Sequence, residues 1–260
     1  MRILITNDDG ISAPGLAAAE TIAAELAGPD GEVWVVAPAF EQSGVSHCIS
    51  YIRPMRIEKL GERRFAVEGS PADCVLAGLH DVLPDSPPDL VLSGVNRGHN
   101  VAEDTLYSGT IGGAMEGALQ GVRSIAMSQY YGPGTTGGDP FDAARAHGAG
   151  ICRALWDAAP WHEAPYGVFY NVNFPPVAAA DISGCKATVQ GRRPHSTFGV
   201  RPQVAPNGRR FLWLTHGEGN ANTDPGTDAR EASDGYITVT PLRADLTARS
   251  LVAAVSAALE

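Results

Sequence analysis

The feature that most constrains the fold is a repeated order of short apolar segment, polar turn and helix. Residues 3–6 form an apolar run, and residues 14–27 follow as a helix with Pro14 in its first turn and Gly28 at its end. Further strands are expected at residues 33–37, 89–93 and 124–128, with a helix over residues 111–120. Short strands buried on both faces and joined by helices favour a largely parallel sheet with right-handed crossovers.

The second half of the chain has a different texture, with a Gly-rich loop at residues 131–138. The pattern predicts a helix over residues 142–156, strands at 168–174, 211–215 and 236–240, and a C-terminal helix over 246–259. Residues 186–234 are polar and rich in turns, and we expect them to form an arm or hairpin outside the main sheet. The whole chain of 260 residues is expected to be a single α/β domain carrying this arm.

Composition excludes several classes of protein. The net charge of -10 argues against general binding to duplex nucleic acid or to anionic membrane. The N-terminal apolar run is too short for a signal peptide, and no apolar run is long enough to span a bilayer. The four cysteines form no C-x-x-C pair and are expected to be reduced and mostly buried, so we expect a cytoplasmic protein.

Polar clusters follow the expected strands, at the edge where open parallel sheets bind their ligands. The clusters are residues 7–10 (NDDG), 41–44 (EQSG) and 93–100 (SGVNRGHN), with a fourth at residues 107–110 (YSGT) just before a helix. Topology alone would bring the first three to one edge of the sheet. Each cluster taken alone has a plainer interpretation as a surface turn, and their coincidence favours a functional site.

The adjacent carboxylates of Asp8 and Asp9 repel each other when both are ionised, and a divalent cation would remove that cost. Asn96 and Ser43 could supply neutral oxygens to the same cation. Hard oxygen ligands select Mg²⁺ or Mn²⁺ over zinc. Such a cation would polarise phosphoryl oxygens and lower the pKa of a coordinated water.

The segment Ser108, Gly109 and Thr110 precedes the helix expected near Ile111. A helix N-terminus offers free N–H donors to phosphate, and Gly109 allows the backbone to come close. The alternative is that Ser108 only caps the helix. His47 and His99 are single histidines in polar segments, for which a surface role is the default interpretation and a general-acid role the alternative.

The sequence also resembles a known family, the metal-dependent 5'-nucleotidases called survival protein SurE. The resemblance rests on ordered motifs over most of the chain, and residues 131–234 match only loosely. The motifs are residues 3–11 (ILITNDDGI), 36–38 (VAP), 42–44 (QSG), 69–75 (GSPADCV), 88–96 (PDLVLSGVN), 107–111 (YSGTI), 114–117 (AMEG), 235–242 (GYITVTPL) and 245–247 (DLT).

The resemblance implies a Rossmann-like, three-layer α/β/α fold and hydrolysis of nucleoside 5'- and 3'-monophosphates, with polyphosphate as a further substrate. It places the ligands of one Mg²⁺ or Mn²⁺ ion per subunit on Asp8, Asp9, Ser43 and Asn96. It also implies a homodimer or homotetramer, with C-terminal elements exchanged between subunits, and residues 186–234 would suit such an arm. Ser70 stands where the family commonly has Thr, and residues 97–100 (RGHN) depart from the usual small residues.

The resulting hypothesis is metal-assisted hydrolysis of a phosphomonoester. Asp8 and Asp9 are the candidate catalytic residues, while Asn96, Ser108, Gly109 and Thr110 bind the phosphate. A phosphatase with an aspartyl nucleophile is disfavoured, because that class usually has two Asp separated by one residue after the first strand. The absence of G-x-G-x-x-G after the first strand disfavours a dehydrogenase. The non-enzymatic alternative is a nucleotide- or metal-binding regulatory protein.

Overall fold

A computed structural model describes residues 1–132, 138–162, 166–193, 198–216 and 223–260. Its main sheet has nine strands in the order β3-β4-β2-β1-β5-β6-β7-β11-β8, and a separate two-stranded sheet holds β9 and β10. The strands are β1 Arg2–Thr6, β2 Glu32–Pro38, β3 Ile57–Gly61, β4 Arg64–Val67, β5 Leu90–Arg97, β6 Arg123–Gln129, β7 Phe169–Phe174, β8 Gly184–Ala187, β9 Phe198–Val204, β10 Arg210–His216 and β11 Tyr236–Leu242. The helices are α1 Pro14–Ala27, α2 Pro71–Ala77, α3 Gly109–Leu119, α4 Asp142–Ala158, α5 Asp228–Ser233 and α6 Val252–Leu259.

The centre of the main sheet is parallel, as the repeated strand and helix order predicts. β1 pairs in parallel with β2 on one side and β5 on the other, and β5, β6 and β7 continue the parallel run. Antiparallel pairs occur where β3 meets β4 and where β11 meets β7. The carboxyl ends of β1, β2 and β5 therefore lie at one edge, which places the polar segments that follow them together.

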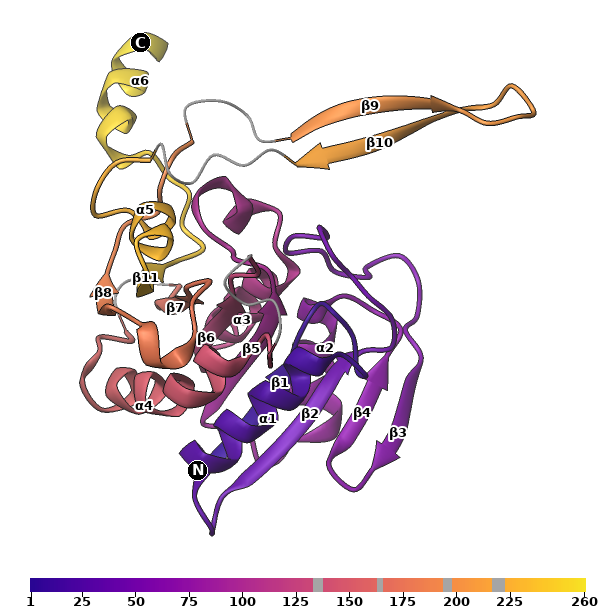
Figure 1. Cartoon of the computed structure of the whole chain (residues 1–260), viewed down its shortest axis with the longest axis vertical. Coiled ribbons are helices and arrows are strands. Elements are labelled where there is room, and N and C mark those ends of the chain that lie inside the picture. The colour runs from indigo at the N-terminus through magenta and orange to yellow at the C-terminus, as the bar shows by residue number, and fades with distance from the viewer. Residues whose placement is uncertain (133–137, 163–165, 194–197, 217–222) are drawn as a thin grey trace.

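Two apolar layers cover the two faces of this sheet. Ile3 and Ile5 of β1 point to the face covered by α1 and α4, whereas Leu4 points to the opposite face with Val75 of α2. Helix α3 lies on that opposite face, where Ile111 packs with Ala126 and Phe169. The alternation along β1 follows from the two-residue period of a strand and produces a three-layer α/β/α sandwich (Figure 1). The predicted fold class is confirmed.

The hairpin of β9 and β10 projects from the body of the molecule, and the C-terminal helix α6 stands apart from the sheet (Figure 1). The expected arm covered residues 186–234, of which 194–197 and 217–222 lie outside the described residues. Within the described part of that range, the hairpin Phe198–His216 projects, whereas β8 joins the main sheet beside β11 and α5 packs near β11. The range expected to form the arm therefore contains a projecting hairpin, while β8 and α5 at its two ends belong to the body of the molecule.

Several predicted boundaries are wrong for identifiable reasons. Helix α6 begins at Val252 instead of residue 246, because the Asp245 carboxylate accepts the backbone N–H of Thr247 (2.9 Å) in a non-helical turn. The strand predicted at residues 89–93 is β5, which runs on to Arg97. β3, β4 and α2 were not predicted at all. Cys74 and Cys152 are buried as expected, but Cys48 and Cys185 are exposed, and all four are free thiols.

None of the described helices is both long enough and apolar enough to cross a bilayer. The cytoplasmic location stays a prediction.

Candidate metal and phosphate site

The turn after β1 fixes the two adjacent carboxylates. Asn7 is buried and closes the turn with two hydrogen bonds, since its Nδ2 donates to the Gly10 carbonyl (2.9 Å) and its Oδ1 accepts the Gly10 N–H (3.2 Å). Gly10 has φ +99°, a conformation that favours glycine. The Asp8 carbonyl in turn accepts the N–H of Gln42 (2.7 Å), which ties this turn to the segment after β2.

Asp8 is a buried carboxylate, only 4% exposed. Burial raises the pKa of Asp8 to about 6, and the charge of Asp9 adds to the rise. Hydrogen bonds from Thr110 oppose it, the stronger being from the Thr110 hydroxyl to Oδ1 (2.6 Å). A buried carboxylate beside a second one is costly when both are ionised, and that is the electrostatic situation a bound cation relieves.

Asp9 lies beside Asp8 but faces a different set of neighbours. Its Oδ2 accepts the backbone N–H of Arg97 at the end of β5 (3.0 Å). Burial raises the pKa of Asp9, and the charge of Glu41 acts in the same direction, while the N–H and the positive charge of Arg97 lower it. Asp9 therefore connects the end of β1 to the end of β5 across the site.

Ser43 and Asn96 offer neutral oxygens at the same edge. The Ser43 hydroxyl donates to Glu41 Oε1 (2.8 Å), which leaves its oxygen lone pairs available to a ligand. Asn96 Nδ2 donates to the Gly98 carbonyl (2.9 Å), so its Oδ1 is the atom left to accept or coordinate.

A bulge in β5 aims Asn96 into the site. The register between β5 and β6 shifts between Ser93 and Asn96, and Gly94 within the bulge has φ +136°. The peptide bond between Gly94 and Val95 is cis. A Cβ atom at Gly94 would overlap the carbonyl of Met127 on β6, so only glycine fits there.

The segment before α3 lies close to Asp8 and comes from the face of the sheet that α2 and α3 cover. Ser108 is the N-cap of α3, and its hydroxyl accepts the N–H of Ile111 (3.1 Å). Ser108 therefore caps the helix, while its part in phosphate binding stays a prediction, and the helix begins at Gly109, two residues earlier than expected. A Cβ atom at Gly109 would lie 2.9 Å from Asp8 Cβ, so glycine here lets the helix start against the carboxylate.

Two neighbouring cavities bring these residues together. A cavity of about 370 Å³ is lined by Asp8, Ser43, Asn96 and Ser108, among others. A second cavity of about 510 Å³ is lined by Asp9 and by Ser43, which the two cavities share. Gly109 and Thr110 contact Asp8 from behind instead of lining either cavity. Within the described part of the chain, no three His, Cys, Asp or Glu side chains are placed to hold a metal, so any cation here needs the mixed set of two carboxylates with hydroxyl and amide oxygens.

The two histidines have different environments, and neither is a simple surface residue. His47 Nε2 lies 2.6 Å from Glu116 Oε2 of α3 and does not line the 370 Å³ cavity. His99 does line that cavity. The His99 ring stacks on Tyr130 with centroids 4.1 Å apart, which fixes the plane of the imidazole.

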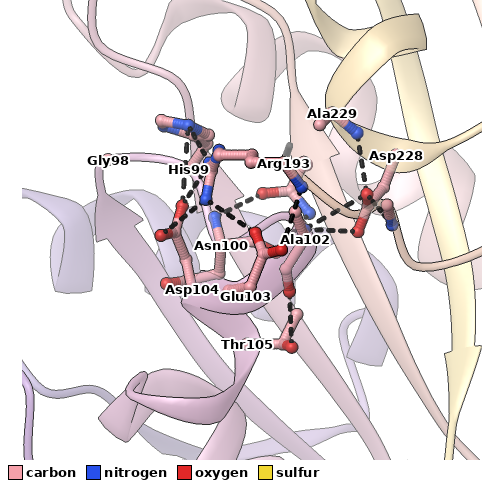
Figure 2. A network of polar contacts seen from close by, with 12 residues as sticks. Gly98, His99, Asn100, Ala102, Glu103, Asp104, Thr105, Arg193, Asp228 and Ala229 are labelled. Carbon is pink, nitrogen blue, oxygen red and sulfur yellow. Dashed lines mark hydrogen bonds and ion pairs between the residues drawn. The ribbon is translucent and has the colours of Figure 1, made fainter. Parts of the chain in front are cut away.

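Sequence inspection did not single out a polar network that supports the wall of the cavity (Figure 2). The Arg193 side chain is 1% exposed and makes a bidentate contact with Asp104, at 3.0 Å from Nη1 and 2.7 Å from Nη2. Glu103 accepts the backbone N–H of Arg193 (2.9 Å), and His99 Nε2 lies 3.4 Å from Arg193 Nη2. The local sequence gives no indication of these contacts, because Arg193 lies 89 residues from Asp104.

A second part of the network joins the segment of residues 102–104 to α5. The Asp228 carboxylate accepts the backbone N–H groups of Ala102, Gly191 and Ala229 (Figure 2). Burial raises the pKa of Asp228, and these N–H donors and the charge of Arg193 oppose the rise.

An aromatic pair also lines the 370 Å³ cavity. Tyr107 and Phe198 meet edge to face with centroids 4.9 Å apart. Phe198 had no sequence signal, because it lies in the segment whose motifs match the family only loosely.

The motif at residues 69–75 has a structural role. Ser70 and Asp73 form a reciprocal capping box at the start of α2, and Asp73 also accepts the N–H and the hydroxyl of Ser50 (2.8 Å each). Pro71 lies against Gly109 and Gly113 of α3. The motif therefore supports the segment that carries Ser108 from behind.

Comparison with known proteins gives consistent matches. The family model described as "Survival protein SurE" matches residues 3–197. The 5'-nucleotidase SurE of Ruegeria pomeroyi is 62% identical over 260 residues and covers 100% of both chains. The 5'-nucleotidase SurE of Cereibacter sphaeroides strain KD131 is 62% identical and covers 99% of both. The crystal structure of the SurE protein from Aquifex aeolicus superposes with a TM-score of 0.82 at 34% identity, covering 100% of both chains.

Proposed function

The chain belongs to the survival protein SurE family, and from that membership we propose that it is a divalent-metal-dependent 5'-nucleotidase. The proposed reaction is hydrolysis of a nucleoside monophosphate to nucleoside and phosphate. The observation that carries the proposal is the meeting of Asp8, Ser43 and Asn96 with the start of α3 at one cavity. The full-length relatives that bear the nucleotidase name support it.

Asp8, Asp9, Ser43 and Asn96 would hold one Mg²⁺ or Mn²⁺ ion per subunit. The donor set fits, because it consists of oxygen atoms and includes a buried carboxylate whose pKa is raised to about 6. When bound, the cation supplies charge neutralisation at the phosphoryl oxygens and a lowered pKa for water. Thr110 orients the Asp8 carboxylate through its hydroxyl, and the Arg97 N–H orients that of Asp9.

The start of α3 would bind the substrate phosphate together with Asn96. The Ser108 hydroxyl accepts the Ile111 N–H, and the Thr110 N–H bonds to Asp8, so Ser108, which lines the cavity, is the point at which the phosphate would meet the helix start. The positive end of the helix dipole favours an anion there, in a protein whose net charge is otherwise -10. The absence of a side chain at Gly109 lets the helix start lie directly against Asp8, which would place a phosphate bound at Ser108 beside the cation.

We also propose that the arm is used in self-association, giving a homodimer or homotetramer. Support comes from apolar side chains that are exposed on the arm, among them Leu212 (62%), Trp213 (57%) and Leu214 (76%). Helix α6 adds exposed Val252 and Leu259. Exposed apolar surface of this kind typically marks a protein–protein contact.

The experiment is phosphate release from nucleoside 5'- and 3'-monophosphates and from polyphosphate, with Mg²⁺, with Mn²⁺ and with chelator. We expect turnover of nucleoside 5'-monophosphates that needs the cation, and loss of turnover in Asp8→Asn with the fold intact by circular dichroism. Asp85→Asn is the matched control, because this exposed carboxylate lies before β5, at the opposite end of the strand from Asn96. Near-normal activity of Asp8→Asn would refute the site, and tight nucleotide binding without hydrolysis would favour the regulatory alternative.

A further inference from the structure

The 370 Å³ cavity is lined by two chemically different groups of side chains. Asp8, Ser43, Asn96 and Ser108 form a polar group. The Tyr107 and Phe198 rings line the same cavity. A nucleotide has the same division, since its phosphate is a hard anion and its base is a flat aromatic surface. The volume lies within the range of about 300–1,000 Å³ that is typical of small-molecule sites.

Tyr107 is adjacent in the chain to the turn that we propose binds the phosphate. It directly precedes Ser108, the N-cap of α3. The segment after β2 holds its backbone in place, because the Ser46 N–H donates to the Tyr107 carbonyl (2.9 Å) and the Ser46 hydroxyl donates to the Leu106 carbonyl (2.7 Å). The Tyr107 ring is therefore attached to the residue that precedes Ser108, where the phosphate would bind.

Phe198 brings the first residue of the arm to the same place. Its ring meets Tyr107 at an interplanar angle of 64°. Arg193, five residues earlier in the chain, has a buried guanidinium held by Asp104, itself a lining residue of the cavity (Figure 2). Phe198, the first residue of the arm, therefore lies at the wall of the same cavity.

Both rings are partly exposed. Tyr107 remains 49% exposed and Phe198 39% exposed. Partly exposed aromatic rings beside a polar site can stack on a base, and such stacking tolerates all bases because every base has a π-face.

We propose that Tyr107 and Phe198 form the surface that binds the nucleobase, so that the arm contributes directly to substrate binding. This inference rests on the proposed nucleotidase function. It assigns Phe198 a substrate contact that is independent of self-association through the outer part of the arm.

The test compares 5'-AMP with ribose 5-phosphate, which has the same phosphoester and sugar but no base. In the presence of Mn²⁺, we expect Phe198→Ala and Tyr107→Ala each to lower kcat/KM for 5'-AMP roughly tenfold. The value for ribose 5-phosphate is expected to stay within about twofold, because the interactions with phosphate are unchanged. Equal losses for both substrates, or no loss for 5'-AMP, would overturn the proposal.

Phe211→Ala is the matched control, because Phe211 is an exposed phenylalanine of the same arm that does not line the 370 Å³ cavity. It should leave both substrates unaffected. Phe198→Leu keeps an apolar side chain without a π-face, and it should reproduce the selective loss if Phe198→Ala does not fold. Size-exclusion chromatography of each variant separates base binding from changes in assembly.

Calorimetric binding distinguishes failure of this inference from failure of the proposed function. If the wild-type protein hydrolyses neither compound, the proposed function fails, and the Kd values of 5'-AMP and ribose 5-phosphate still test the aromatic surface. Tighter binding of 5'-AMP that is lost in Phe198→Ala supports the inference. Equal Kd values for the two compounds in the wild-type protein contradict it.

Discussion

The floor of the site, which we define as the central strands β1 and β5 with the helices packed on them, differs from the projecting arm in how its apolar side chains are covered. In the floor, Ile3, Leu4 and Ile5 of β1 are completely buried, and the helices approach the sheet so closely that glycine is required at the contacts. In the arm, β9 and β10 pair only with each other and leave Leu214 76% exposed. The side chains of β1 are thus covered within one chain, whereas the arm presents apolar side chains that the described part of the chain does not cover.

This difference separates the residues that determine folding from those that determine assembly. Close packing makes the floor intolerant of added atoms, since protein interiors are packed like crystals. Exposed side chains on a two-stranded hairpin make few contacts to lose, so their substitution should affect stability little. The network at Arg193 lies between these extremes, because it is buried yet joins a residue shortly before the arm to the segment after β5.

The largest effect is expected at Gly15, in the first turn of α1. A Cβ atom there would overlap the carbonyl of Val95 on β5 and lie 3.1 Å from the Phe141 ring. Gly15→Ala should therefore lower the free energy of unfolding by about 4 kcal/mol, since neither the backbone nor the buried ring can move freely. Urea denaturation followed by circular dichroism measures the change.

Gly150 provides the control for that substitution. It is an exposed helical glycine of α4 with no atom near the site of a Cβ. Gly150→Ala should raise stability by about 0.5–1 kcal/mol through helix propensity alone. If the two alanine variants had equal stability, the close packing of α1 on β5 would not be what constrains the floor.

The second effect concerns the buried Arg193. Arg193→Met would leave the Asp104 carboxylate, with an 11% exposed side chain, without its bidentate partner. Breaking one side of such a pair should cost about 3 kcal/mol, mostly from the uncompensated charge. The double variant Arg193→Met with Asp104→Leu should recover much of the loss in urea denaturation, and equal losses in the single and double variants would contradict this explanation.

The third effect is the dependence of stability and metal binding on pH through Asp8. Its folded pKa of about 6 lies above the ordinary value of 3.8, so the folded state binds the proton more tightly than the unfolded state. In the metal-free protein, the contribution of this group is therefore most favourable below pH 4. It falls as the pH rises to 6, by about 3 kcal/mol at most, and is constant above that.

A bound cation needs the ionised carboxylate, so Mn²⁺ affinity should fall about tenfold per pH unit below pH 6 and level off above it. Thermal unfolding with Mn²⁺ and with chelator, between pH 4.5 and 8, measures both trends. Asp8→Asn should abolish the dependence of the Mn²⁺-induced rise in Tm on pH. A constant Mn²⁺-induced rise across this range in the wild-type protein would argue against Asp8 as a ligand.

The same contrast explains which parts could be predicted from the sequence. The apolar run of β1 and the Pro14 and Gly28 signals gave correct boundaries for α1, because local chemistry determines them. The rule that ligands bind beyond strand ends predicted that Asp8, Ser43 and Asn96 would lie together, although their roles as ligands stay a prediction. The antiparallel strand β3 was missed because all of its residues are exposed, which removes the apolar alternation.

The supporting contacts could not be predicted, because they join residues far apart in the chain. Arg193 bonds to Asp104 and Phe198 meets Tyr107, and no sequence pattern relates the positions in either pair. The bulge in β5 depends on how closely Gly94 approaches Met127 of the neighbouring strand. Both features follow from tertiary packing. Periodicity and capping signals describe local structure and carry no information about such long-range contacts.

The smallest effect on folding is expected in the arm, where it sharpens the contrast most directly. Leu214 on β10 is exposed, so Leu214→Ser should change the free energy of unfolding by no more than about 0.5 kcal/mol at protein concentrations where the chain is monomeric. If the arm mediates self-association, the same variant should shift the oligomer toward monomer in analytical ultracentrifugation, because the lost contact would lie between subunits. A large loss of monomer stability without a change in assembly would show that the arm packs within its own chain, and the separation between floor and arm would fail.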